Sequence, residues 1–408
     1  MSETPAKAAH PLLWWVLIAA GGTFALTMGV RQSMALFMGP LNTATGLGVA
    51  SISLAFAFGQ LWWGLTQPFA GALADRVGAG RVLLAGVLLV ALGTFLTPWM
   101  HSTAGLVFAI GVLAAGGAGM AGPAVLMSAT TRLVPVHRRG LASGVVNAGG
   151  SLGQFAIVPI AGGLLLATGW ANALQWLAVL VLLALPAAWV LRGHAQPAAG
   201  APGQPRLGAR AAIAQAWQLP GYRYLVAGFF VCGFHVAFLA THLPGVVAAC
   251  GLPLQYGAWS LAVLGLFNIA GSILMGWAVG RWRMKSLLSL VYSVRALAVL
   301  VFLLAPKTGP VLLAFAAVMG LSYLSTVPPT VGLVLKFFGP SNMALLFGIV
   351  MLSHQVGGFL GAWLGGQVFQ ATGSYDTVWI IDILLAVGAA LVHLPIREAP
   401  VAVRPVPA

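Results

Sequence analysis

Long apolar segments recur along the whole chain, and they limit its fold more than any other feature. Each has about 20 residues or more, enough for a helix to cross the roughly 30 Å hydrocarbon core of a bilayer. Of 408 residues, 60% are hydrophobic and 6% are charged, whereas about 25% are charged in soluble domains. We place twelve such segments, at residues 12–38, 51–73, 81–99, 104–131, 141–167, 170–192, 222–248, 256–280, 286–305, 308–336, 342–370 and 376–396.

Each segment is expected to form an α-helix. In lipid only helices and closed barrels satisfy every backbone hydrogen bond, and barrel strands would be about ten residues long with alternating polarity. The first segment, Leu12 to Met38, exceeds the apolar core of a signal peptide, and no small-residue cleavage site interrupts it. We therefore predict an all-α membrane protein with twelve transmembrane helices. Pro123, Pro328 and Pro329 mark places where the fourth and tenth helices can bend.

Membrane topology explains the net charge of +14. Nearly all of the 19 Lys and Arg lie at segment ends that share one side of the membrane once the N-terminus is placed inside. Because basic loops stay in the cytoplasm, both termini are expected there, in a multi-pass protein of the cell inner membrane. The lipid bilayer is thus an expected partner and nucleic acid is not. Cys232 and Cys250 are too far apart on one predicted helix for a disulfide, no metal-binding spacing occurs, and no metal or cofactor is expected.

The two halves of the chain repeat each other. Two parallel six-helix repeats are typical of one class of secondary transporter, whose substrate site lies near the membrane midplane between the repeats. We predict six-helix bundles at residues 1–192 and 222–408. The repeat is visible at an offset of 204 residues, which places Gly144, Gly153, Phe155, Gly162, Thr168 and Gly169 on Gly348, Gly357, Phe359, Gly366, Thr372 and Gly373.

A polar stretch joins the two predicted bundles. Residues 193–221 are rich in Pro, Gly and Arg, and we predict a cytoplasmic linker with a short helix at the membrane surface near Arg206–Gln218. A disordered tether is an equal alternative for its first half, which contains Pro197, Pro202 and Pro205.

The loop between the second and third segments carries a distinctive pattern. It reads Gly71-Ala-Leu73-Ala-Asp75-Arg76-Val-Gly78-Ala-Gly80-Arg81, and it resembles the G-x-L-x-D-R-x-G-x-x-R loop of the major facilitator superfamily. The resemblance implies the two-bundle fold of that superfamily, in which this loop latches the second helix to its neighbours when the outward-facing state forms. It assigns the conformational latch to Gly71, Asp75, Arg76, Gly78 and Arg81. The second half retains only Gly276 to Arg281, without the acid.

Three further stretches resemble the monocarboxylate and oxalate–formate transporter branch of this superfamily. They are Gly29 to Ser33, Gly233 to Pro244, and Ser353 to Gly358. Relatives in that branch often place a cation on the eighth helix, where it meets the substrate carboxylate. Residues 256–280 hold no cation here, and Asn268 is their main interior polar group.

A short element of the fifth segment points in another direction. Pro159-Ile-Ala-Gly162-Gly163 is a partial match to an element of drug–proton antiporters. Helix packing through small residues explains these glycines equally well.

Two arginines interrupt the apolar segments. A charge in hydrocarbon is costly, so such side chains are functional candidates. Arg31 lies in the outer part of the first helix, and we expect it to bind an anionic substrate. Snorkelling to the membrane surface or bonding to a backbone carbonyl is the alternative. Arg295 is a second candidate for substrate binding, with a structural role, such as an ion pair with Asp382, as its alternative.

Three histidines also lie inside apolar segments, and we expect them to contact substrate and carry a coupling proton. His235 and His242 are seven residues apart, about two helical turns, so they share a face of the seventh helix. His354 lies in the middle of the eleventh helix. Histidine titrates near neutral pH, and Asp382 is the one acid well inside an apolar segment. For each histidine, the alternative is a core side chain with satisfied hydrogen bonds.

Four polar residues complete the predicted substrate site: Tyr323, Asn147, Gln154 and Asn268. Gln60 and Gln67 are further candidates for polar lining of the cavity. Ordinary hydrogen bonds between helices, worth about 0.6 kcal/mol each, are the alternative for them. With two arginines and three histidines the expected site is electropositive, and such a site favours anions.

These features predict a secondary transporter that moves a small organic anion, a monocarboxylate, by alternating access, coupled to protons and acting as a monomer. A drug or metabolite efflux antiporter is the alternative, although pumps for cationic drugs usually need a membrane carboxylate. An enzyme is not expected, because paired carboxylates, an H-E-x-x-H run and a nucleophile with a spaced base do not occur in the sequence. The sequence does not separate a transporter from a sensor that no longer transports.

Overall fold

The computed structural model describes residues 10–133, 139–192, 209–339 and 343–399. Regular structure in these residues is helical throughout, and 12 helices are long and apolar enough to cross a membrane, as predicted. The first six spans are built from α1 (His10–Ser33), η1 (Met34–Phe37), α2 (Met38–Thr45), α3 (Val49–Val77), α4 (Ala79–Leu96), η2 (Thr97–Trp99), α5 (Thr103–Leu106), η3 (Val107–Ala114), α6 (Ala115–Met120), α7 (Pro123–Leu133), α8 (Arg139–Thr168), α9 (Trp170–Val181), η5 (Leu182–Ala184) and α10 (Leu185–Val190).

The second six spans follow a short helix, α11 (Ala209–Gln218), which corresponds to the surface helix expected near Arg206–Gln218. The rest of the linker, residues 193–208, lies outside the described residues. The spans are α12 (Pro220–Ala249), α13 (Leu254–Val279), α14 (Met284–Leu304), α15 (Gly309–Ser322) with α16 (Val327–Phe338), α17 (Met343–Thr372) and α18 (Asp376–His393).

The fourth and tenth spans are interrupted where their prolines lie. α6 ends at Met120 and α7 begins at Pro123, whereas α15 ends at Ser322 and α16 resumes with Pro328 in its first turn. Proline has no N–H to continue a helical ladder, so the chain breaks ahead of it. The continuous helix expected over 308–336 is therefore two helices. The break turns backbone carbonyls and Tyr323 toward neighbouring helices.

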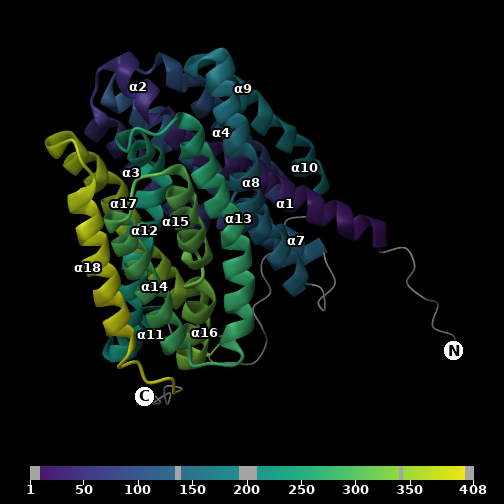
Figure 1. Ribbon diagram of the computed structural model, residues 1–408. Coiled ribbons are helices and arrows are strands. Elements are labelled where there is room, and N and C mark those ends of the chain that lie inside the picture. The colour runs from purple at the N-terminus through teal and green to yellow at the C-terminus, as the bar shows by residue number, and fades with distance from the viewer. Residues whose placement is uncertain (1–9, 134–138, 193–208, 340–342, 400–408) are drawn as a thin grey trace.

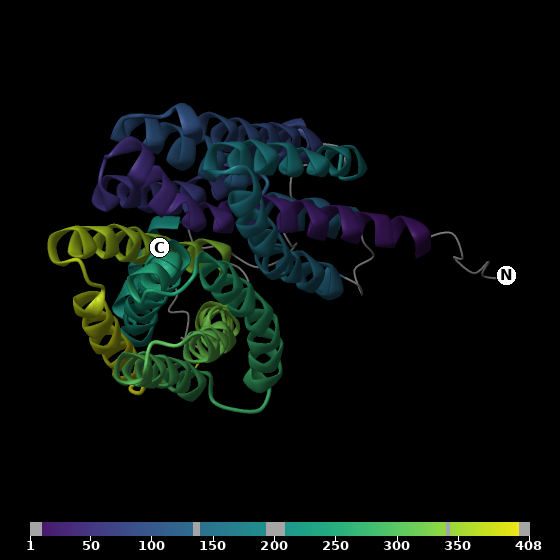
Figure 2. The ribbon, with the colours of Figure 1, turned by 45° about the horizontal axis from the view of Figure 1, so that its top comes forward.

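The helices form two groups that Figure 2 separates clearly, α1–α10 in purple to teal and α12–α18 in green to yellow. Within each group the first and fifth spans pack closely through glycine. A Cβ on Gly153 would lie 2.0 Å from the carbonyl oxygen of Ala25, and one on Gly357 would lie 2.0 Å from that of Phe230. These two glycines are equivalent in the sequence repeat, and they occupy equivalent positions in the structure.

The two groups touch mainly along α3 with α17 and along α8 with α13. We call the face where α1 begins and α18 ends the terminal face, and the opposite one the far face. Near the far face, Gln370 accepts a hydrogen bond from the backbone N–H of Ala50 at 2.8 Å, and Ser53 lies against Gly366. At the terminal face, Figure 1 shows the lower ends of α7 and α8 diverging from α13 and α16. The two groups are therefore in contact near the far face, and their helix ends diverge at the terminal face.

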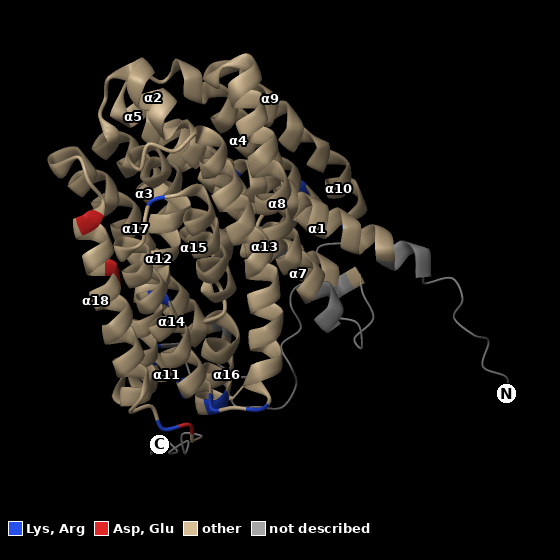
Figure 3. Ribbon diagram, viewed as in Figure 1, with Lys and Arg blue, Asp and Glu red and all other residues tan. Residues whose placement is uncertain are grey.

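Charge is scarce along the spans, as Figure 3 shows, and basic side chains gather where α16 and α14 meet the terminal face. Lys336 pairs there with Glu398 at 3.2 Å, and Lys285 donates to the backbone oxygen of Leu394 at 2.7 Å. Large apolar side chains cover the outside of the bundle, and Phe69 and Leu304 are 75% and 80% exposed. Such a surface suits hydrocarbon and not water.

Candidate functional site

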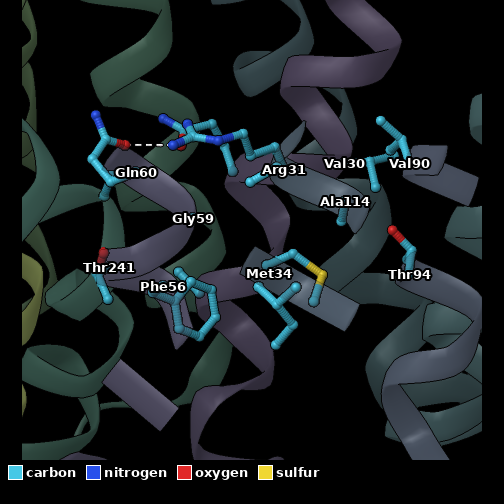
Figure 4. A pocket seen from close by; sticks show the side chains of 15 residues that line it. Val30, Arg31, Met34, Phe56, Gly59, Gln60, Val90, Thr94, Ala114 and Thr241 are labelled. Carbon is cyan, nitrogen blue, oxygen red and sulfur yellow. Dashed lines mark hydrogen bonds between the residues drawn. The ribbon is translucent and has the colours of Figure 1, made fainter. Parts of the chain in front are cut away.

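A pocket lies among the first four spans and is closed on one side by α12. Figure 4 shows Arg31 crossing it toward Gln60, with Val30, Met34 and Phe56 around the arginine. Apolar side chains from α1, α3, α4 and η3 form most of its wall, and the polar side chains are Arg31, Gln32, Gln60, Thr94 and Thr241.

Arg31 supplies the positive charge of this pocket. It belongs to the last turn of α1 and is half-buried. Its guanidinium donates to the Gln60 side-chain oxygen and lies over the Trp63 ring, 5.0 Å from the ring centre. Among the side chains that the structure describes, no carboxylate pairs with it. Its partner is a neutral amide, so its charge is not neutralised.

Gln60 links Arg31 to the second bundle. Its amide nitrogen donates to the side-chain oxygen of Gln355 on α17 at 3.0 Å. The chain of hydrogen bonds thus runs from α1 through α3 to α17, across the contact between the bundles. The sequence indicated Arg31 but not this chain, since Gln60 and Gln355 lie 295 positions apart.

Two buried donors in this region have no acceptor. The side-chain nitrogen of Gln355 and the indole nitrogen of Trp63 are both buried without a hydrogen-bond partner in the structure. Unpaired buried donors are rare and call for an explanation. Both belong to residues that contact Arg31 directly or through Gln60, so the region has more donors than acceptors.

Tyr323 is an electrostatic neighbour of Arg31. The break between α15 and α16 places it there. Its hydroxyl donates to the backbone oxygen of Val236 at 2.9 Å and has Gln32 and Arg31 as electrostatic neighbours. Among the predicted lining residues, Gln60 lines the pocket and Tyr323 is an electrostatic neighbour of Arg31.

The other predicted lining residues do not line the pocket. Asn268 donates to Ser151 at 2.8 Å and accepts from the backbone of Leu324 at 3.1 Å, so it connects the bundles. Gln154 packs against Gly265 in the same contact, and Asn147 is exposed. Asn268 thus matches the alternative of hydrogen bonds between helices, and Gln154 matches that of packing between them.

The three histidines lie inside the second bundle, away from the pocket lining. His242 is bonded to the backbone oxygen of Ala362 at 2.7 Å, and its other nitrogen faces the Tyr375 hydroxyl at 3.4 Å. His354 packs on Phe229, with ring centres 5.1 Å apart, and its Nδ1 has no partner. His235 and His242 are both buried, but they contact different helices.

Arg295 is 1% exposed, and its two Nη atoms have acceptors, whereas its buried Nε has none among the described residues. It donates to the backbone oxygens of Ser322 and Tyr323 at 2.5 and 2.7 Å, both at the end of α15. The expected direct ion pair with Asp382 is absent from the described contacts, because His235 lies between the two side chains. Arg295 therefore does not offer its charge to the pocket.

The latch sequence lies at the junction of α3 and α4, on the terminal face. Gly78 ends α3 with φ 93°, a conformation that favours glycine, and a side chain at Gly71 would meet open space. Arg76 and Arg81 are exposed. The side chain of Asp75 lies outside the described part of the structure, so its latch role stays a prediction.

Comparison with known proteins agrees with this architecture. The Major Facilitator Superfamily profile matches residues 19–311. Monocarboxylate transporter 13 of Rattus norvegicus is 25% identical over 387 residues, 94% of this chain and 89% of that protein. The oxalate:formate antiporter of Oxalobacter formigenes is 24% identical over 384 residues, 90% of this chain and 87% of that protein.

Solved structures share the fold. A bacterial homologue of the human lysosomal transporter Spinster, in an inward-facing and unoccupied conformation, matches with a TM-score of 0.73 and 16% identity, covering 94% of this chain and 96% of that one. With a family profile over most of its length and relatives that are transporters and not enzymes, this chain belongs to the Major Facilitator Superfamily, near its monocarboxylate and oxalate–formate transporter branch.

Proposed function

We propose that this transporter carries a small organic anion with one carboxylate, and that Arg31 binds that carboxylate. The observation that carries the proposal is the excess of donors around an unneutralised guanidinium. Arg31, the Trp63 indole and the Gln355 amide offer N–H groups, while Gln60 provides the one side-chain acceptor that Arg31 contacts. A carboxylate brings two oxygens and a negative charge, and it pairs well with a guanidinium.

A single accessible cation suits a monocarboxylate better than a dicarboxylate. The second membrane arginine, Arg295, is buried outside the pocket lining and its Nη2 is held by two backbone carbonyls, so a second carboxylate in the pocket would find no second charge. The wall of the pocket is largely apolar, with Phe56 and Met34 beside the charge. It matches an anion with a short hydrocarbon part. The names of the relatives, monocarboxylate transporter and oxalate:formate antiporter, support an anion as substrate.

Gln60 gives the bound anion a way to act on the contact between the bundles. The carboxylate competes with the Gln60 oxygen for Arg31, and the same amide holds Gln355 of the other bundle. Binding therefore releases Gln60 and loosens one link across the interface. Alternating access requires the anion to make different contacts in the two conformational states, because a ligand shifts a conformational equilibrium only through contacts that differ between them.

We assign transport to a proton-coupled cycle in the cell inner membrane, with the terminal face in the cytoplasm and the loop around Asp75 as conformational latch. The basic side chains at the terminal face support this orientation.

The test measures binding and transport with defined anions. Purified protein is heated with formate, lactate, pyruvate or oxalate, and the shift of the unfolding temperature is recorded. We expect a monocarboxylate to stabilise the wild type, and Arg31→Gln to abolish the shift. Arg31→Lys keeps the charge but loses the planar fork, so uptake into proteoliposomes should fall sharply. Arg223→Gln, an exposed arginine at the start of α12, is the matched control.

An unchanged shift and unchanged uptake in both Arg31 variants would remove Arg31 from the site. Stabilisation by organic cations, with no response to any of the four anions, would favour the efflux antiporter instead.

A further inference from the structure

A second polar cluster lies inside the second bundle, apart from the pocket. It joins His235 on α12, Arg295 on α14 and Asp382 on α18, and each of these side chains is 1% exposed. Three helices thus bring a base, a cation and an acid together where water is excluded. A buried ionisable group in a membrane protein is a functional candidate, because the group is costly to keep there.

The hydrogen bonds define where the proton of the His235 ring sits. Arg295 Nη1 lies 3.5 Å from His235 Nδ1, and a guanidinium can only donate, so Nδ1 is the acceptor. The ring proton is therefore on Nε2, which lies 3.1 Å from the backbone oxygen of Asp382 and donates to it. Both ring nitrogens are engaged, and His235 has no free position for another proton.

One oxygen of the Asp382 carboxyl has no hydrogen-bond partner in the described part of the structure. Its Oδ1 also lies 3.1 Å from His235 Nε2, yet it accepts no hydrogen bond, since the N–H is directed at the backbone oxygen. A buried carboxylate oxygen without a donor is unfavourable. Arg295 does not relieve it directly, because its Nη2 is held by the carbonyls at the end of α15. A proton placed on this carboxyl removes the unpaired charge.

The titratable and charged side chains in and next to this cluster come from α12, α14, α17 and the end of α15. Most are neutral donors or acceptors, and Arg295 is the one permanent charge among them. They are His235, Cys232, Arg295, Tyr292, Tyr323 and His354.

Tyr323 connects this cluster to the pocket. Its backbone oxygen accepts from Arg295 at 2.7 Å, whereas its hydroxyl has Arg31 as an electrostatic neighbour. The anion proposed at Arg31 and a proton in the cluster carry opposite charges, so each favours the presence of the other in a low-dielectric interior. The two sites are thus placed for joint loading.

We propose that the Asp382 carboxyl is the proton-binding site of the transport cycle, and that His235 is the positioning residue that holds it beside Arg295. In the loaded state the carboxylate has accepted a proton from water and is a neutral acid. On release, the O–H bond breaks, the proton returns to water and the carboxylate forms again. This inference rests on the proposed function, and it places the coupling proton on Asp382 where the sequence pointed to the histidines.

The experiment separates proton coupling from substrate movement. Wild type and Asp382→Asn are placed in liposomes that contain a pH-sensitive dye, and formate, lactate and pyruvate are added in turn. We expect anion-dependent proton flux in the wild type and its loss in Asp382→Asn. Exchange of labelled for unlabelled anion should continue in that variant, because asparagine resembles the protonated acid and does not release a proton.

Three further variants make the result specific. Asp376→Asn removes an exposed acid at the first residue of the same helix and should keep proton flux. Asp382→Glu keeps a titratable group and should restore part of it. His235→Gln should change the pH profile of uptake while Asp382 still couples. Proton flux that persists in Asp382→Asn would overturn the inference, and binding at Arg31 would stand.

A measurement on the wild-type protein tests the inference whether or not the Asp382 variants fold. The infrared band of a protonated carboxylic acid is followed against pH in the purified protein. Asp382 is buried, and we expect a band that Asp376→Asn leaves in place and that responds to formate, lactate or pyruvate. Absence of any such band between acid and alkaline pH would contradict the inference. Failure of all anions to shift the unfolding temperature, with the band present, would instead contradict the proposed substrate.

Discussion

Arg31 and Arg295 are both arginines within helical bundles, yet their surroundings are opposite. Arg295 is fully buried and its donors meet two backbone carbonyls and a histidine. Arg31 is half-buried, and its neighbours bring a neutral amide and an aromatic face. A guanidinium whose Nη atoms meet backbone carbonyls of another helix holds helices together, whereas the one that lies beside further donors is the one that we propose to bind an anion. The partners of a membrane charge, and not the charge alone, indicate its role.

The largest effect that we expect is a loss of stability on removal of Arg295, and the contrast between the two arginines depends on it. Arg295→Ala should destabilise the fold by about 3–5 kcal/mol, because it leaves two backbone carbonyls and the His235 ring without their donor, and each unsatisfied buried group costs about 1–3 kcal/mol. Arg31→Ala should cost far less, since its side chain is half-buried and bonded to one amide. Thermal unfolding of both purified variants in the same detergent gives the difference. Equal losses of stability would show that the two arginines have the same role.

A carboxylate introduced next to Arg31 would sharpen the comparison. Gln60→Glu has nearly the shape of the wild type but gives Arg31 an internal anion in place of the substrate. Because a hydrogen bond to a charged group contributes about 1.5–3 kcal/mol, anion binding should fall by about tenfold or more. The change in unfolding temperature with lactate measures this, with Gln218→Glu on α11 as control. Retained binding would mean that the substrate does not compete for Arg31.

Equivalent glycines test whether the two bundles share their packing. Gly153→Ala and Gly357→Ala each place a methyl group on a neighbouring backbone oxygen, so both should lose about 1–3 kcal/mol. Gly144→Ala and Gly348→Ala, on the same two helices, meet open space. These controls should be neutral or gain about 0.4–1 kcal/mol from a less flexible unfolded chain. A loss in only one half would contradict structural equivalence of the repeats.

The smallest expected effect on affinity belongs to Asp75→Asn. The residue lies near the terminal end of α3, far along the helix from Gln60 and the pocket. Transport should slow while lactate affinity stays near that of the wild type, because the latch acts on cycling. Turnover and affinity are separated by uptake measured over a series of lactate concentrations. A large affinity loss with normal turnover would exclude the latch role.

The twelve spans could be predicted from the sequence because length and hydropathy are local properties of each segment. The repeat was also predictable, since Gly153 and Gly357 mark close helix contacts in equivalent positions. Arg31 could be found because a charge in an apolar segment is conspicuous. Its partners could not, because Gln60 and Trp63 meet it only through the packing of α1 on α3.

The role of Arg295 depended on a break in another helix. Pro328 and Pro329 indicated that the tenth span can bend, but not that the freed carbonyls of Ser322 and Tyr323 would take the arginine donors. The contact of His235 with Asp382 spans 147 positions and has no local signal. Such contacts depend on how the helices are placed against one another, and the periodicity within one segment carries no information about that placement.

The bond between Gln370 and α3 has a consequence for the contact near the far face. Gly48 is the N-cap residue of α3 and has no side chain with which to satisfy the first turn. Gln370 of the other bundle satisfies it instead, by accepting from Ala50. A capping bond contributes about 1 kcal/mol. When the bundles separate on that face, the first turn of α3 stays uncapped until water replaces the Gln370 amide. The barrier to opening there therefore includes the loss of a capping hydrogen bond, in addition to the loss of packing.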